Sequence, residues 1–225
     1  MSAPLAITYF SDILCVWAYV AEVRLAELES AHQGEIAIVH RFVSVFGDAH
    51  GKLEAGWAAR GGVDGYAAHV AATVAKFPPA PLHPHTWTHV RPHSSLSPHL
   101  MLKAVEAWET EVCGTTTRTA AAISALRRAF FADAADIGRR EVQLALFARL
   151  DIDLAGVDIA LADGRAHARL AADYALAEKS RIEGSPTFLL NEGRQKLYGN
   201  VGFRVISANI RELLRGPGEG EASWC

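Results

Sequence analysis

The pattern of hydrophobic and polar positions divides the chain into two ends that contain strands and a helical middle. Near the N-terminus, an apolar run at residues 5–10 predicts a strand, residues 15–30 a helix, and a β-branched run at 36–43 a buried strand. A strand, a helix and a strand in this order form a βαβ unit, so we expect parallel strands joined by a right-handed crossover. Much of the apolar stripe of the predicted helix comes from four residues: Tyr19, Val23, Ala26 and Leu28.

The middle of the chain has a helical period. Residues 50–62 are rich in glycine and are predicted to be irregular, residues 64–76 to be helical, and residues 78–98 to form a loop rich in proline and histidine. From residue 97 to about residue 161, apolar residues recur at helical spacing and predict several amphipathic helices. The stripes are Met101, Val105 and Trp108; Ile123, Leu126 and Phe130; and Val142, Leu146 and Leu150.

The C-terminal third returns to strands. An alanine-rich helix is expected at 165–181, strands at 187–190 and 196–198, and a last helix striped by Ile206, Ile210 and Leu213. If the strands of the two ends pair, residues 1–48 and 165–215 form one discontinuous α/β domain. Residues 49–164 are then an inserted helical domain, and residues 216–225 are a flexible tail.

Composition limits the classes of function. Half of the 225 residues are hydrophobic, and the net charge of −3 has no long run of either sign, so no nucleic-acid partner is expected. No apolar stretch is long enough to span a bilayer, and the start lacks the basic segment of a secretory signal. Three cysteines are an odd count and give no disulfide framework. These features predict a cytoplasmic protein that is not associated with a membrane.

One cysteine stands out by its position. Cys15 follows the first strand and a short polar break at Ser11 and Asp12, at the point where the first helix begins. Unpaired N–H groups and the positive end of the helix dipole meet a side chain at this position. Both favour the thiolate, which is the reactive form of cysteine. Cys15 is therefore the candidate nucleophile, and Asp12 is expected to cap the helix and to oppose the thiolate slightly.

Cys15, together with the segment from Glu183 to Leu190 (EGSPTFLL), resembles the thioredoxin fold. The long helical block resembles the DsbA-type branch of that superfamily, to which kappa-class glutathione transferases and 2-hydroxychromene-2-carboxylate isomerases also belong. The resemblance implies an α/β, thioredoxin-like fold with an inserted all-helical domain. It also implies a cis Ser185–Pro186 bond beside the sulfur, which would leave the Ser185 main chain free to pair with a peptide or with glutathione.

The chain departs from the DsbA pattern at one decisive residue. DsbA-type oxidoreductases carry Cys-x-x-Cys, whereas this chain has Cys15-Val-Trp-Ala18. A dithiol closes to its own disulfide, whereas a lone thiolate stops at a mixed disulfide. The transferases and isomerases of this branch carry serine at the position of Cys15 and use glutathione as the thiol. Like the DsbA-type oxidoreductases, this chain has a cysteine at the nucleophile position. Like the transferases and isomerases, it lacks the second cysteine of the motif.

The leading hypothesis is a thiol-dependent, DsbA-like oxidoreductase with Cys15 and Pro186 as catalytic residues. Trp17, Ser185 and Thr187 are expected to contact the substrate, a small thiol or disulfide. Glutathione is expected as a co-substrate, no cofactor is expected to be tightly bound, and a homodimer is a further expectation. Two alternatives stay open: a glutathione-dependent transferase or isomerase acting on an aromatic carboxylate, and a non-catalytic binding protein on the same scaffold.

Several other side chains could take part in this chemistry. Cys225 ends an arm that could span about 30 Å and is either a resolving thiol or a solvated terminal residue. Cys113 is expected to be a small buried hydrophobic residue. Arg41 and Arg91 are candidate ligands for a carboxylate. Trp17 either walls an apolar substrate pocket or packs on the inserted helices.

Five histidines crowd the segment around the predicted loop: His83, His85, His89, His93 and His99. No cysteine or carboxylate joins them, so no metal site is expected. One of these histidines is expected to line the thiol pocket and to tune the charge of Cys15.

Overall fold

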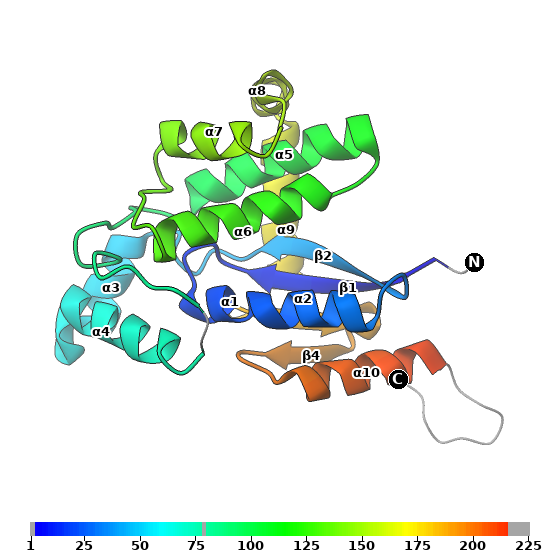
Figure 1. Ribbon diagram of the computed structural model, residues 1–225, viewed down its shortest axis with the longest axis horizontal. Helices are drawn as coiled ribbons and strands as arrows, with labels where there is room; N and C mark the ends of the chain where they lie inside the picture. The colour runs from blue at the N-terminus through cyan, green and yellow to red at the C-terminus, as the bar shows by residue number, and fades with distance from the viewer. Residues whose placement is uncertain (1–2, 78–79, 216–225) are drawn as a thin grey trace.

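The computed structural model describes residues 3–77 and 80–215 (Figure 1). Its strands form one mixed sheet in the order β2-β1-β3-β4. Their bounds are Leu5–Ser11 for β1, Ile36–Phe42 for β2, Thr187–Leu190 for β3 and Gln195–Tyr198 for β4. β1 and β2 run parallel, as predicted, and β3 runs antiparallel to both β1 and β4. The two ends of the chain therefore share one sheet.

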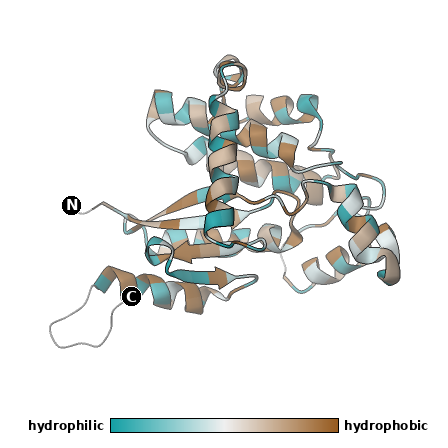
Figure 2. Ribbon diagram, turned by 180° about the vertical axis from the view of Figure 1, so that it is seen from behind, coloured by the Kyte–Doolittle hydropathy of each residue, from teal (hydrophilic) through white to brown (hydrophobic). Residues whose placement is uncertain are grey.

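Helices cover both faces of this sheet. On one face lie α1 (Val16–Val20), α2 (Glu22–Ala31) and α10 (Phe203–Arg215), whereas α9 (Arg165–Lys179) crosses the other face (Figures 1 and 2). The side chains of β1 alternate accordingly. Tyr9 packs in a cluster with residues of α2 and α10, whereas Phe10 packs with Ala177 of α9.

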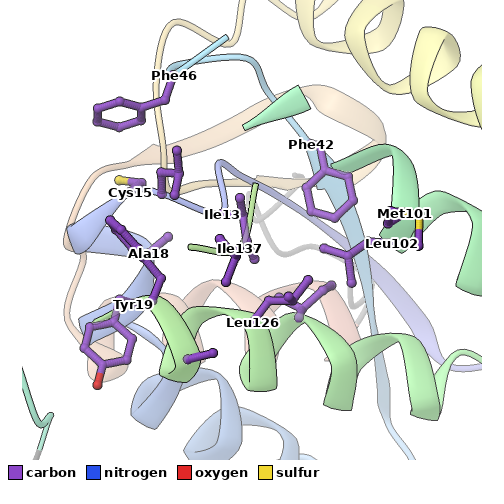
Figure 3. Close-up of a cluster of buried hydrophobic side chains, with 14 of the residues drawn as sticks. Ile13, Cys15, Ala18, Tyr19, Phe42, Phe46, Met101, Leu102, Leu126 and Ile137 are labelled. Atoms are coloured by element: carbon purple, nitrogen blue, oxygen red, sulfur yellow. The ribbon is translucent and has the colours of Figure 1, made fainter. Parts of the chain in front are cut away.

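The remaining helices lie between residues 49 and 162, where the sequence predicts the insertion. They are α3 (Ala49–Trp57), α4 (Gly62–Val74), α5 (Leu96–Cys113), α6 (Thr117–Phe131), α7 (Arg140–Ala148) and α8 (Leu154–Ala162), with a short 3-10 turn at Ala58–Arg60. Their apolar side chains form the largest buried cluster, which also includes Cys15 and Ala18 (Figure 3). The inserted helices and the Cys15 segment therefore share one core. The predicted tail, residues 216–225, lies outside the described residues.

The structure corrects four local predictions. The strand expected to be buried at 36–43 lies at the edge of the sheet as β2 and is largely half-buried. Residues 50–62 are largely helical because the Asp48 side chain accepts the Gly51 N–H and caps α3, whose Leu53 is buried. The helix expected at 15–30 is divided at Ala21, so Val23 and Ala26 face solvent and Leu25 is buried instead. In α7, Gln143 and Phe147 are buried, whereas the predicted stripe of Val142, Leu146 and Leu150 is only half-buried.

Across residues 3–77 and 80–215, none of the helices has the length and apolar character needed to cross a membrane.

Candidate active site

Cys15 meets the Ser185–Pro186 turn although the two lie far apart in the sequence. Cys15 precedes the first residue of α1, is 6% exposed, and its Sγ lies 3.2 Å from the carbonyl oxygen of Ser185. The Ser185–Pro186 peptide bond is cis. Figure 3 shows Cys15 and Phe46 together at one margin of the large buried cluster. The structure thus brings the candidate nucleophile into contact with the turn that the sequence pairs with it.

The other residues predicted for the site lie close by, with different exposure. Ser185, Pro186 and Thr187 are all buried, and the Thr187 hydroxyl donates to the Gly184 carbonyl at 2.9 Å, inside the turn. Trp17 is half-buried, and its ring lies edge-on to those of Phe77, at 6.0 Å, and His69, at 6.4 Å. Of the two roles expected for Trp17, the structure shows packing against the inserted segment. Cys225 lies outside the described residues.

The thiol of Cys15 is not activated in this arrangement. Burial raises its pKa, and the nearby Asp12 adds to the increase. The Ser185 side chain and the main-chain N–H groups of Ala18 and Trp17 act in the opposite direction. The helix start favours the thiolate, as expected, but desolvation outweighs this effect and the pKa is raised.

Asp12 is the centre of a buried hydrogen-bond network rather than the cap of α1. Its Oδ2 accepts from the N–H groups of Val45, at 2.9 Å, and Phe46, at 2.8 Å, and from the Ser95 hydroxyl, at 2.8 Å. Its Oδ1 accepts from the Leu14 N–H at 2.9 Å, and its own N–H donates to the Ser185 hydroxyl at 2.9 Å. Burial raises the pKa of Asp12, and these donors act in the opposite direction. One carboxylate thus joins the Cys15 loop, the segment after β2 and the start of α5.

His99 is the histidine that reaches this network. Its Nε2 accepts the Ile13 N–H at 3.1 Å and so carries no proton, while its Nδ1 lies 3.1 Å from the Tyr174 hydroxyl. The ring stacks on Phe42 with centroids 4.3 Å apart. Burial holds the pKa of His99 well below the ordinary value, and the charges of Arg127 and Lys103 act in the same direction. A neutral ring cannot stabilise a thiolate at Cys15 by its charge.

The neutral state of His99 predicts a loss of stability in mild acid. The unfolded chain binds a proton on this side chain near pH 6.5, whereas the folded protein does not, so stability falls as the pH drops. From pH 7.5 to 5.5 this group alone should remove about 1.4 kcal/mol from the free energy of unfolding. Urea unfolding at both pH values, compared with His99→Gln, measures the difference. An equal loss in the two proteins would show that His99 is not the source.

Both arginines predicted to bind a carboxylate have partners within the protein. Arg41 donates to Asp173 at 2.8 Å, and the fully buried Lys103 pairs with the same carboxylate at 2.7 Å. Arg91 donates to the main-chain carbonyls of Trp87 and Thr88. Lys103 lies on α5, so the Asp173 carboxylate joins the inserted helices to β2 and α9.

Two further expectations concern cysteine and histidine. Cys113 is exposed rather than buried, at the end of α5, with its Sγ 3.7 Å from a guanidinium nitrogen of Arg118. The helix ends there on an exposed, largely polar turn, Thr110-Glu111-Val112-Cys113, so the position faces solvent. Within residues 3–77 and 80–215, no three or more His, Cys, Asp or Glu side chains are grouped so that they could hold a metal ion.

Comparison with known proteins agrees with this architecture. The family description "DSBA-like thioredoxin domain" matches residues 6–211, so the chain belongs to the DsbA-like thioredoxin family. Its fold is therefore the α/β thioredoxin-like fold with inserted helices that the sequence predicts. No curated protein sequence matches the chain.

Three solved structures share the fold at low sequence identity. A probable DsbA oxidoreductase from Streptomyces coelicolor has a TM-score of 0.73 at 20% identity, over 95% of this chain and 92% of that one. The cytosolic disulfide reductase DsbM from Pseudomonas aeruginosa has a TM-score of 0.66 at 20% identity, over 92% and 99% of the two chains. A 2-hydroxychromene-2-carboxylate isomerase has a TM-score of 0.65 at 16% identity, over 94% and 97%.

Proposed function

We propose that this protein is a thiol-dependent oxidoreductase that works through a single nucleophilic cysteine, via a mixed disulfide. The observation that carries the proposal is the contact between the Cys15 sulfur and the Ser185 carbonyl at a cis Ser185–Pro186 bond, in a chain of the DsbA-like family. Ala18 is fully buried and supplies no second thiol at the other end of the motif.

The chemistry is an exchange of sulfur partners. The Cys15 thiol loses its proton, and its sulfur attacks one sulfur of a substrate disulfide. A new S–S bond forms to Cys15, the old S–S bond breaks, and the second half of the substrate leaves as a thiolate that takes up a proton. A second thiol, for which we propose glutathione, then attacks the substrate sulfur of the mixed disulfide. A new S–S bond joins glutathione to the substrate half, the bond to Cys15 breaks, and Cys15 leaves as a thiolate that takes up a proton. No tightly bound cofactor is needed in either step.

The cis turn supports this reaction through its main chain. In the resting form the Ser185 carbonyl accepts the thiol proton of Cys15. When the sulfur becomes part of a disulfide it no longer donates, so that carbonyl is available to an N–H group of the substrate. Substrate binding would thus exchange one hydrogen bond for another, beside a sulfur that burial otherwise keeps protonated.

Intact mass spectrometry tests the proposal, provided that Cys113 and Cys225 are first replaced by alanine, because the exposed Cys113 could react by itself. In this parent variant, oxidised glutathione should add one glutathione. Adding Cys15→Ala should remove the adduct completely. A parent that takes up no glutathione would contradict the proposal.

A second candidate is a glutathione-dependent transferase or isomerase acting on an aromatic carboxylate. The resting Cys15 favours it in one respect: a protonated thiol that donates a hydrogen bond resembles a serine hydroxyl in that role. Under this alternative, glutathione binds reversibly and the parent variant gains no mass. We place either reaction in the cytoplasm, where DsbM, a structural neighbour described as cytosolic, acts as a disulfide reductase.

A further inference from the structure

A cleft of about 240 Å³ lies beside the turn that holds Cys15. Its lining comes from the end of α9, the start of β3 and the edge strand β4, and consists of Arg181, Ile182, Glu183, Thr187, Lys196 and Tyr198. Thr187 follows Ser185 by two residues, and two residues of chain span at most about 7 Å. The cleft therefore begins within two residues of the Ser185 carbonyl that contacts the Cys15 sulfur.

Two cations line the cleft without a carboxylate partner. Among the residues that the structure describes, neither Arg181 nor Lys196 forms an ion pair, in contrast to Arg41 in the same domain. The Lys196 ammonium lies against the C-terminal end of α9, 3.0 Å from the Ser180 carbonyl and 3.4 Å from that of Arg181. With Glu183 as the single acid of the lining, the cleft carries a net charge of +1.

Arg181 occupies a position that favours glycine. Its φ is +51°, in the left-handed region, directly after the last turn of α9, where the Ile182 N–H bonds to the Ala177 carbonyl at 2.8 Å. Glycine would fit this helix end with less strain. The chain instead has an exposed arginine at this position, in the lining of the cleft.

Tyr198 forms an exposed aromatic wall beside the cations. It is 68% exposed although it lies on a strand, and its ring covers Gly184 so closely that a Cβ there would lie 2.6 Å from the Tyr198 Cε2. Gly184 is thus required for the approach of the ring. The exposed ring offers a face to a ligand that passes over the turn.

We infer that this cleft binds an acidic group of the substrate, so that the protein selects disulfides and thiols that carry a carboxylate. The inference rests on the proposed function and names its substrate class. Arg181 and Lys196 would bind the carboxylate, and the Tyr198 ring would flank the main chain that links it to the sulfur. Glutathione, a tripeptide with two carboxylates, has this chemistry.

The first test compares an acidic and a neutral disulfide in the parent variant that keeps only Cys15. Arg181→Gln with Lys196→Gln should slow adduct formation with oxidised glutathione about tenfold, the equivalent of ~1.4 kcal/mol, and leave the rate with bis(2-hydroxyethyl) disulfide unchanged. Glu183→Gln should increase the rate with oxidised glutathione only. Arg211→Gln, on α10, is the control for a general loss of positive charge. Equal changes with both disulfides would overturn the inference.

A second test needs no redox step. S-methylglutathione cannot form a disulfide, and calorimetry measures its affinity directly. The parent should bind it, and the double variant Arg181→Gln/Lys196→Gln should bind about tenfold more weakly. Such a result would support the cleft even if no mixed disulfide forms, in which case only the proposed function fails. If the parent does not bind it, or the double variant binds it equally well, the cleft is not a carboxylate site.

Discussion

Replacing Asp12 with alanine should lower the free energy of unfolding by about 4 kcal/mol or more, because each buried donor left without a partner costs about 1–3 kcal/mol. Four donors would be affected: the N–H groups of Leu14, Val45 and Phe46 and the hydroxyl of Ser95. Since total stabilities are about 5–15 kcal/mol, the loss would be a large part of the whole. Chemical denaturation at pH 7 measures it.

Ser95→Ala is the matched control for Asp12→Ala. It removes one donor and leaves the carboxylate with its three N–H partners, so we expect a loss of about 1 kcal/mol. If Asp12→Ala costs no more than Ser95→Ala, the carboxylate does not hold the three segments together. Such a result would also remove the physical reason for the position of the Cys15 loop against Ser185.

Replacing Ala18 with cysteine should change the end point of the reaction with oxidised glutathione. The two positions are three residues apart at the start of α1, which in helical geometry places their Cα atoms about 5 Å apart, within the range of disulfides. The new thiol would attack the mixed disulfide on Cys15, form an internal S–S bond and release glutathione as a thiol. In the background without Cys113 and Cys225, the adduct should disappear and the protein should lose the mass of two hydrogens.

Ala18→Ser is the control, because it adds a polar atom of similar size at the same buried position and cannot form the bond. It should keep the glutathione adduct. If the adduct accumulates in Ala18→Cys to the same extent as in Ala18→Ser, the absence of a second thiol is not what stops the reaction at the mixed disulfide.

Most of the fold can be predicted from the pattern of strands and from the residues of the turns. The run at 36–43 is rich in β-branched residues, the segment 187–190 lies between a Ser-Pro turn and Asn191, and both contain strands in the structure. The helical stripes of α5 and α6 were equally readable, since Met101, Val105, Ile123, Leu126 and Phe130 are buried. The pairing of Cys15 with Ser185–Pro186 came from the resemblance to a family, because no local pattern links positions so far apart.

The electrostatics of the site could not be predicted in the same way. The helix start at Cys15 is visible in the sequence and predicts a lowered pKa, but the burial that reverses the effect depends on the inserted helices. The sequence predicts that Asp12 caps the first helix. In the structure its partners include Val45, Phe46 and Ser95, which lie 33 to 83 residues away along the chain. The signal that could have revealed it is the polar Ser11–Asp12 pair itself, which is fully buried directly after a core strand.

The contact of Cys15 with the Ser185–Pro186 turn is most directly tested by a crystal structure of the protein after treatment with oxidised glutathione. We predict an S–S bond from the Cys15 sulfur to glutathione, with the main chain of the tripeptide paired to Ser185. Glutathione attached only to Cys113, with the Cys15 sulfur still on the Ser185 carbonyl, would contradict the account.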